Sequence, residues 1–112
     1  ARPVAEIEEV AAKVITVLSK RLEGRASLTV QACKSQIGSG ALPLELMESR
    51  ALCITPLAEK GRTDEALQRL SAAFRALPKP VIGRIYDGRL LFDLRCLRNV
   101  DEFLGQLEDL PD

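Results

Sequence analysis

The sequence predicts an α+β fold, a two-layer sandwich in which about four mainly antiparallel strands form one sheet and three amphipathic helices pack mainly on one of its faces. Three observations support this prediction. Apolar residues recur at helical spacing in three segments, two short runs have the pattern of strands, and an Asp-Gly pair between two apolar-rich runs indicates a β-hairpin. The predicted order is helix, strand, strand, helix, hairpin, helix, within a single domain spanning residues 1–112.

The first helix is predicted from Pro3 to about Glu23. Proline suits the first helical turn, because the N–H that it lacks would have no partner there. Acidic residues follow it, basic residues end the segment, and Gly24 allows a left-handed exit. One stripe of valine, isoleucine and leucine should therefore face the core.

Two strands and a loop follow. Ser27 to Cys33 alternates apolar with polar residues, as half-buried strands do, and Arg50 to Thr55 contains a continuous apolar run that suits an inner strand. Lys34 to Pro43 is polar and glycine-containing, which favours an irregular loop, and Leu44 to Glu48 is compatible with a helical turn. We therefore expect the chain to leave the sheet between the two strands.

The second and third helices are predicted on either side of the hairpin. Thr63 or Asp64 can cap the second helix, and Pro78 stops it. The third begins at Asn99 in a segment that resembles a capping box, and Pro111 closes it. Each helix carries an apolar stripe that should pack on the sheet.

The hairpin occupies Pro80 to Arg95 and turns at Asp87-Gly88, because a type I′ turn needs positive φ at both central residues. Counting outward gives the pairs Tyr86–Arg89, Ile85–Leu90, Arg84–Leu91, Gly83–Phe92, Ile82–Asp93 and Val81–Leu94. One face is then wholly apolar and must be core, with the Phe92 ring covering Gly83. The other face is mixed and should be partly covered by something else; it carries Ile82, Arg84, Tyr86, Arg89, Leu91, Asp93 and Arg95.

Composition argues against several functions. Sixteen basic and sixteen acidic residues cancel, so the chain has no global field to attract DNA or an anionic membrane. Histidine is absent, which removes the commonest general base and metal ligand, and the three cysteines lack C-x-x-C spacing. We therefore expect no catalytic group, no metal site and no membrane partner. The abrupt start of the chain and the lack of a membrane-length apolar run suggest a piece of a longer cytoplasmic protein.

Two motifs carry a family resemblance. The loop S-Q-I-G-S-G-A-L-P (Ser35 to Pro43) and the hairpin P-V-I-G-R-I-Y-D-G-R-L-L-F-D-L-R (Pro80 to Arg95) resemble the C-terminal end of bacterial selenocysteine synthases, the L-seryl-tRNA(Sec) selenium transferases. The flanking helices agree in kind, so the resemblance covers essentially the whole chain. It implies the small C-terminal domain of an aminotransferase-like (fold type I) pyridoxal-phosphate enzyme.

The resemblance also implies an activity and its partners. Family members use pyridoxal phosphate and selenophosphate to convert seryl-tRNA(Sec) to selenocysteyl-tRNA(Sec), and they form large homo-oligomers. Their Schiff-base lysine follows an aspartate in the large domain, whereas none of the five lysines here follows aspartate. The implied partners are therefore the large domain of the same chain, further subunits and selenocysteine tRNA. The fragment alone is expected to bind no cofactor and to be inactive.

Arg84 is the foremost substrate-binding candidate. Its guanidinium could orient a carboxyl, phosphate or selenophosphate group, as the arginine on small-domain strands does in aminotransferase-like enzymes. The alternative is a cross-strand ion pair with Asp93, its diagonal neighbour on the same hairpin face. The sequence favours neither.

The glycine-rich loop supplies the other candidates. Ser35, Gln36, Gly38, Ser39 and Gly40 could line the cofactor cleft or contact the aminoacyl end of the tRNA, because exposed N–H groups in such turns bind anions. The alternative is an ordinary connection between strands.

Two other functions are also compatible with the sequence. The chain could belong to a pyridoxal-phosphate enzyme of the same family that never binds tRNA. It could also be a free-standing α+β module that binds a ligand or RNA through Arg84 and the loop.

Overall fold

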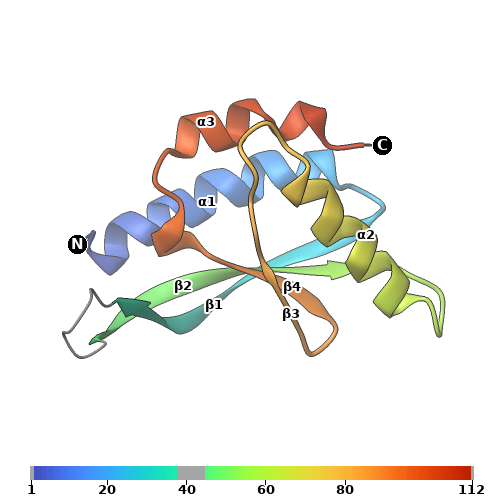
Figure 1. Ribbon diagram of the computed structural model, residues 1–112. Helices are drawn as coiled ribbons and strands as arrows, with labels where there is room; N and C mark the ends of the chain where they lie inside the picture. The colour runs from blue at the N-terminus through green and yellow to red at the C-terminus, as the bar shows by residue number, and fades with distance from the viewer. Residues whose placement is uncertain (1, 38–44, 112) are drawn as a thin grey trace.

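The sheet and its helices form the predicted α+β sandwich. The computed structural model describes residues 2–37 and 45–111. Its elements in chain order are α1 (Val4–Arg21), β1 (Ala26–Ile37), β2 (Glu45–Pro56), α2 (Thr63–Arg75), β3 (Arg84–Tyr86), β4 (Arg89–Asp93), the 3-10 turn η1 (Leu94–Cys96), α3 (Val100–Gly105) and the 3-10 turn η2 (Leu107–Asp109). The antiparallel strands lie in the order β1-β2-β4-β3. All three helices lie on one side of this sheet (Figure 1), which confirms the predicted layers.

The core lies between the helices and that face of the sheet. The helical stripe of α1 is buried, as its spacing predicts. It packs with Leu52 and Ile54 of β2 and with Leu67 and Phe74 of α2. The Phe74 ring also lies 4.9 Å from the Phe92 ring of β4, so that α2 and the second hairpin share one apolar cluster.

The first two strands are longer than the sequence predicts. β1 and β2 pair continuously from Ala26↔Pro56 to Ile37↔Glu45. The expectation of a loop from Lys34 and of a helical turn through Glu48 is therefore wrong: residues 34–37 and 45–48 extend the ladder. Their backbone groups are satisfied by the opposite strand, and this outweighs the weak local preference for a loop or a helix. The remainder of the predicted loop, residues 38–43, lies outside the described residues.

The second hairpin has the predicted turn and register but is shorter than expected. Asp87 and Gly88 both have positive φ (52° and 73°), as a type I′ turn requires. The three innermost pairs, Arg84↔Leu91, Ile85↔Leu90 and Tyr86↔Arg89, are confirmed.

The three outer pairs of that hairpin do not form. Pro80 has no N–H, and the N–H of Val81 donates to the Phe74 carbonyl at 3.0 Å instead of joining a ladder. On the other arm, the Asp93 carboxylate accepts from Arg95 N at 3.0 Å and starts η1. The arms separate, and an apolar hollow of about 350 Å³ lies between them, lined by Val81 and Ile82 on one side and Leu94 and Leu97 on the other.

The helix ends follow the predictions in part. Asn99 caps α3, because its Oδ1 accepts from Glu102 N at 2.9 Å. The helix is short, however, and the expected continuation toward Pro111 is the 3-10 turn η2. The expected caps of α2 are wrong: Thr63 is the first helical residue, and the N-cap is Arg62, which makes no side-chain capping bond.

Candidate functional site

The sheet has a second face that no described helix covers, and we call it the open face. Its membership follows from the register, because side chains alternate and Leu52 and Ile54 point into the core. The open face carries Thr29, Gln31, Cys33 and Ser35 of β1, Met47, Ser49, Ala51 and Cys53 of β2, Arg89, Leu91 and Asp93 of β4, and Arg84 and Tyr86 of β3.

Side chains of the two strands beside β2 cover the middle of the open face. Arg89 Nη1 of β4 donates to Gln31 Oε1 of β1 at 2.9 Å, and this bond crosses β2. Arg89 precedes Leu90, the partner of Ile54, and Gln31 is the partner of Ala51, so the bond passes over Cys53 between them. Cys53 is 0% exposed although no described helix lies above it. Polar side chains of the sheet itself thus shield Cys53, whereas Arg84 and Tyr86 on the hairpin part of this face remain exposed.

Arg84 stands on the exposed edge strand β3. Its guanidinium carbon lies 5.2 Å from the centroid of the Tyr86 ring, a cation–π distance. Asp93, the alternative partner, instead accepts from Ser49 Oγ at 2.5 Å and from Arg95 N. Within residues 2–37 and 45–111, no ion pair joins Arg84 to Asp93. The guanidinium donors of Arg84 are therefore not committed to that carboxylate and could bind a planar anion.

The loop candidates lie away from Arg84. Ser35 belongs to β1 and is buried on the open face, whereas Gln36 points to the opposite side of the sheet. Arg84 lies across the sheet from Thr29, and Ser35 is six residues further along β1, which corresponds to about 20 Å along the strand. Gly38, Ser39 and Gly40 lie outside the described residues. The structure does not bring Ser35 and Gln36 together with Arg84.

A polar cluster on the open face was not anticipated from the sequence. Ser49 Oγ of β2 donates to Asp93 Oδ1 of the neighbouring strand β4, and Cys33 of β1 is the register partner of Ser49 on the other side. Burial raises the pKa of that thiol, and the nearby Asp93 carboxylate adds to the rise, more than Ser49 and Arg50 lower it. Cys33 is therefore held as a neutral thiol, which is a poor nucleophile. The cluster holds the strands together and does not form an activated catalytic group.

The lysines of this chain do not fit a pyridoxal-phosphate site by themselves. A Schiff-base lysine is activated by desolvation or by a neighbouring cation. All five lysines are exposed here, and Lys34 is paired with Glu48 at 2.5 Å. The part of the chain that the structure describes also contains no cluster of three potential metal-ligating side chains.

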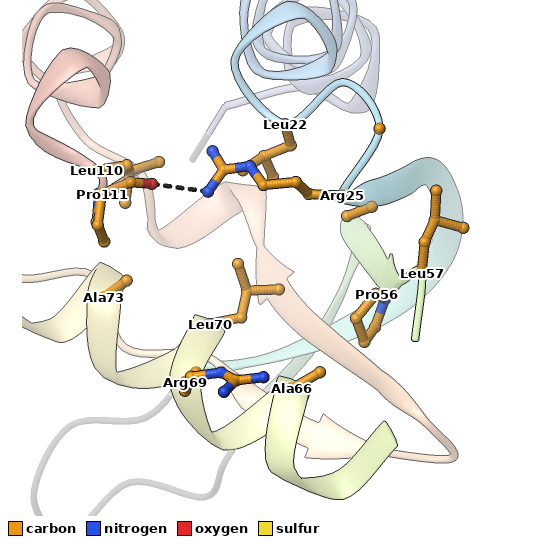
Figure 2. A pocket seen from close by; sticks show the side chains of 12 residues that line it. Leu22, Arg25, Pro56, Leu57, Ala66, Arg69, Leu70, Ala73, Leu110 and Pro111 are labelled. Carbon is orange, nitrogen blue, oxygen red and sulfur yellow. Dashed lines mark hydrogen bonds between the residues drawn. The ribbon is translucent and has the colours of Figure 1, made fainter. Parts of the chain in front are cut away.

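A second hollow, of about 430 Å³, lies on the helix side of the sheet, away from the open face. Figure 2 shows it between the end of α1, the α2 helix and the last described residues, with Leu70 projecting into it. Arg25 at its rim donates to the Pro111 carbonyl at 2.7 Å and to the Arg21 carbonyl at 2.9 Å. Because this guanidinium already binds backbone carbonyls, the hollow resembles a packing defect at a helix junction more than an anion site.

Fold and site together define an α+β domain with one helix-covered sheet face and one open face that carries an arginine at its edge. No described helix is both long enough and apolar enough to cross a membrane.

The chain belongs to the L-seryl-tRNA selenium transferase family, whose model matches residues 1–98. It is 44% identical over 110 residues to the L-seryl-tRNA(Sec) selenium transferase of Methylocella silvestris, covering 98% of this chain and 23% of that protein. The enzymes of that name from Serratia proteamaculans and Klebsiella pneumoniae are 44% and 46% identical over 106 residues, covering 95% of this chain and 22% of each relative. The chain therefore spans less than a quarter of the length of these curated relatives.

Proposed function

We propose that this chain is the small C-terminal domain of a pyridoxal-phosphate-dependent selenium transferase that converts seryl-tRNA(Sec) to selenocysteyl-tRNA(Sec) with selenophosphate. The observation that carries the proposal is the family match over residues 1–98, together with 44–46% identity to relatives named for this activity. Because no lysine here follows an aspartate, as the Schiff-base lysine of the family does, we place the cofactor in a large domain of the same protein, outside residues 1–112.

The open face is the surface that meets the large domain. Helices already cover the other face, and the Tyr86 ring of the edge strand is 59% exposed on the open one. Tyrosine and arginine, which stand side by side here as Tyr86 and Arg84, are enriched at protein interfaces. The domain thereby supplies one wall of the active site, and the protein acts as a cytoplasmic homo-oligomer on selenocysteine tRNA. Three free cysteines agree with a reducing compartment.

Arg84 is the residue of this wall that binds substrate. It lies on the edge strand, has no described carboxylate partner and presents a guanidinium that can hold a carboxyl, ester, phosphate or selenophosphate oxygen. When bound, pyridoxal phosphate supplies the electron sink for chemistry at the serine carbon, and Arg84 orients the group that reacts.

The test is Arg84→Ala in the full-length enzyme, with conversion of seryl-tRNA(Sec) as the readout. Loss of an orienting charged contact should lower kcat/KM about 100-fold. The melting temperature should stay within about 1 °C, because exposed side chains contribute little to stability.

Arg75→Ala is the matched control. This arginine is exposed in the last turn of α2, on the helix side of the sheet and away from the open face, so its loss should leave kcat/KM nearly unchanged. A large fall in melting temperature with unchanged turnover for Arg84→Ala would refute the proposed role.

A further inference from the structure

The segment that carries Arg84 into the sheet has no regular secondary structure of its own. Residues 78–83 belong to no described helix or strand, and β3 contains only three residues. So short an edge strand is weakly held by its ladder alone. The position of Arg84 therefore depends on the contacts that fix the residues before it.

Gln106 fixes the beginning of this segment. Its Oε1 accepts from Lys79 N at 2.8 Å, and its Nε2 donates to the Lys79 carbonyl at 2.8 Å. Pro78 and Pro80 flank Lys79 and have no N–H, so Gln106 binds the one backbone donor of these three residues. The glutamine is only 8% exposed. Because the oxygen and the nitrogen of its side-chain amide both bond to the backbone of Lys79, this buried amide holds Lys79 in a defined place.

Two contacts further along complete the path to Arg84. The N–H of Val81 donates to the Phe74 carbonyl at 3.0 Å. Gly83 packs so closely on β4 that a Cβ there would lie 2.6 Å from the Phe92 ring and 2.8 Å from the Leu91 carbonyl oxygen. From Lys79 to Gly83 the backbone is thus fixed by tertiary contacts, and Gln106 is the side chain that makes the first of them.

We infer that Gln106, which touches neither substrate nor Arg84, is a positioning residue that holds the segment 79–83 and thereby sets where the Arg84 guanidinium stands. The inference rests on the proposed role of Arg84. It adds a second residue, at the C-terminal end of α3, on which that role depends.

The test is a double-mutant cycle between Gln106→Met and Arg84→Ala in the full-length enzyme. Methionine has similar length and volume but lacks both hydrogen bonds to Lys79. Gln106→Met alone should lower kcat/KM for seryl-tRNA(Sec) about tenfold, because even a small displacement of a substrate-binding group lowers the reaction rate. In the Arg84→Ala background the same change should have no further effect, since residues that act through one another are not additive.

Asn99→Ala is the matched control. It removes the Asn99–Glu102 cap at the other end of α3 and destabilises the same helix without touching Lys79. The kcat/KM of Asn99→Ala should stay within about twofold of the parent value, because loss of the cap lowers only the stability of the helix. Amide hydrogen exchange of residues 81–86 should speed up in Gln106→Met and not in Asn99→Ala.

The outcomes separate the two proposals. Unchanged kcat/KM for Arg84→Ala would overturn the role of Arg84 itself. An impaired Arg84→Ala beside an unimpaired Gln106→Met would overturn the role of Gln106 alone. Equal losses from Gln106→Met in both backgrounds, or a loss matched by Asn99→Ala, would reduce Gln106 to a general structural residue and also overturn the inference.

Discussion

The two hairpins of the sheet differ in what holds them. The β3–β4 hairpin has a turn whose two positive-φ residues set its register, but only three pairs form. The β1–β2 ribbon has twelve pairs, from Ala26↔Pro56 to Ile37↔Glu45. A strong turn thus determines register without determining length, and length depends on what competes for the backbone groups further out.

The competition is visible where the short hairpin ends. The Phe74 carbonyl of α2 accepts a hydrogen bond from Val81 N–H, and the Asp93 carboxylate accepts one from Arg95 N–H. The two arms therefore turn away from each other. The outer half of the β1–β2 ribbon has no such competitor within the described residues. It gains the Lys34–Glu48 pair and a bond from Arg95 Nη2 to the Glu48 carbonyl. The short hairpin is therefore held by the core, and the outer ribbon by its own ladder, the Lys34–Glu48 pair and the bond from Arg95 of η1.

The largest expected effect comes from removing the core contact of the short hairpin. Phe92→Ala deletes the ring that packs on Phe74 and Gly83 and should destabilise the chain by about 3–5 kcal/mol. Leu46→Ala on the outer ribbon, where the side chain is 62% exposed, should change stability by no more than about 0.5 kcal/mol. Urea unfolding of both variants measures the difference; similar losses would show that the hairpins do not differ in this way.

A smaller effect is expected at the end of the β3 arm. Gly83→Ala places a Cβ less than 3.0 Å from the Phe92 ring and from the Leu91 carbonyl oxygen. This overpacking should lower the free energy of unfolding by about 1–3 kcal/mol. Gly105→Ala is the control, since its Cβ would meet nothing within 4 Å in helix α3, and it should stabilise by up to about 1 kcal/mol. Equal melting temperatures for the two variants would contradict the close packing at Gly83.

The smallest effect concerns the ion pair of the outer ribbon. A hydrogen bond from Lys34, and then its charge, lower the pKa of Glu48. A carboxyl with a lowered pKa stabilises the fold above its unfolded-state pKa, and that contribution is lost as the pH falls through the folded-state value. Lys34→Met should therefore raise the pKa of Glu48 toward its ordinary value, with little change in stability because the pair is exposed.

Titration of the Glu48 carboxyl by NMR measures this shift, and Lys13→Met, an exposed lysine on α1, serves as the control. A Glu48 titration curve that Lys34→Met leaves in place would show that the cross-strand pair does not form in solution.

The candidate site was predicted from the sequence only in part. Alternation from the Asp87-Gly88 turn correctly separates the buried side chains of β4 from the face that carries Arg84, because the register is local. On β3 the expected core residue Ile85 is 36% exposed, because this short edge strand extends beyond the helices. The separation of Ser35 from Arg84 was not predictable, since it depends on the order of the strands and on the length of β1. Gln106 was also missed: a glutamine near a helix end has no pattern of its own, and its partner Lys79 lies 27 residues away.

The sequence by itself determined the elements whose causes are local. These are the amphipathic helices, the type I′ turn, the cap at Asn99 and the alternation of faces along β4. The tertiary structure alone decided how far each strand runs, which side chains cover Cys53 and what holds the segment before Arg84. The physical reason is that backbone N–H and C=O groups take whichever partner the fold brings within reach, and those partners come from distant parts of the chain.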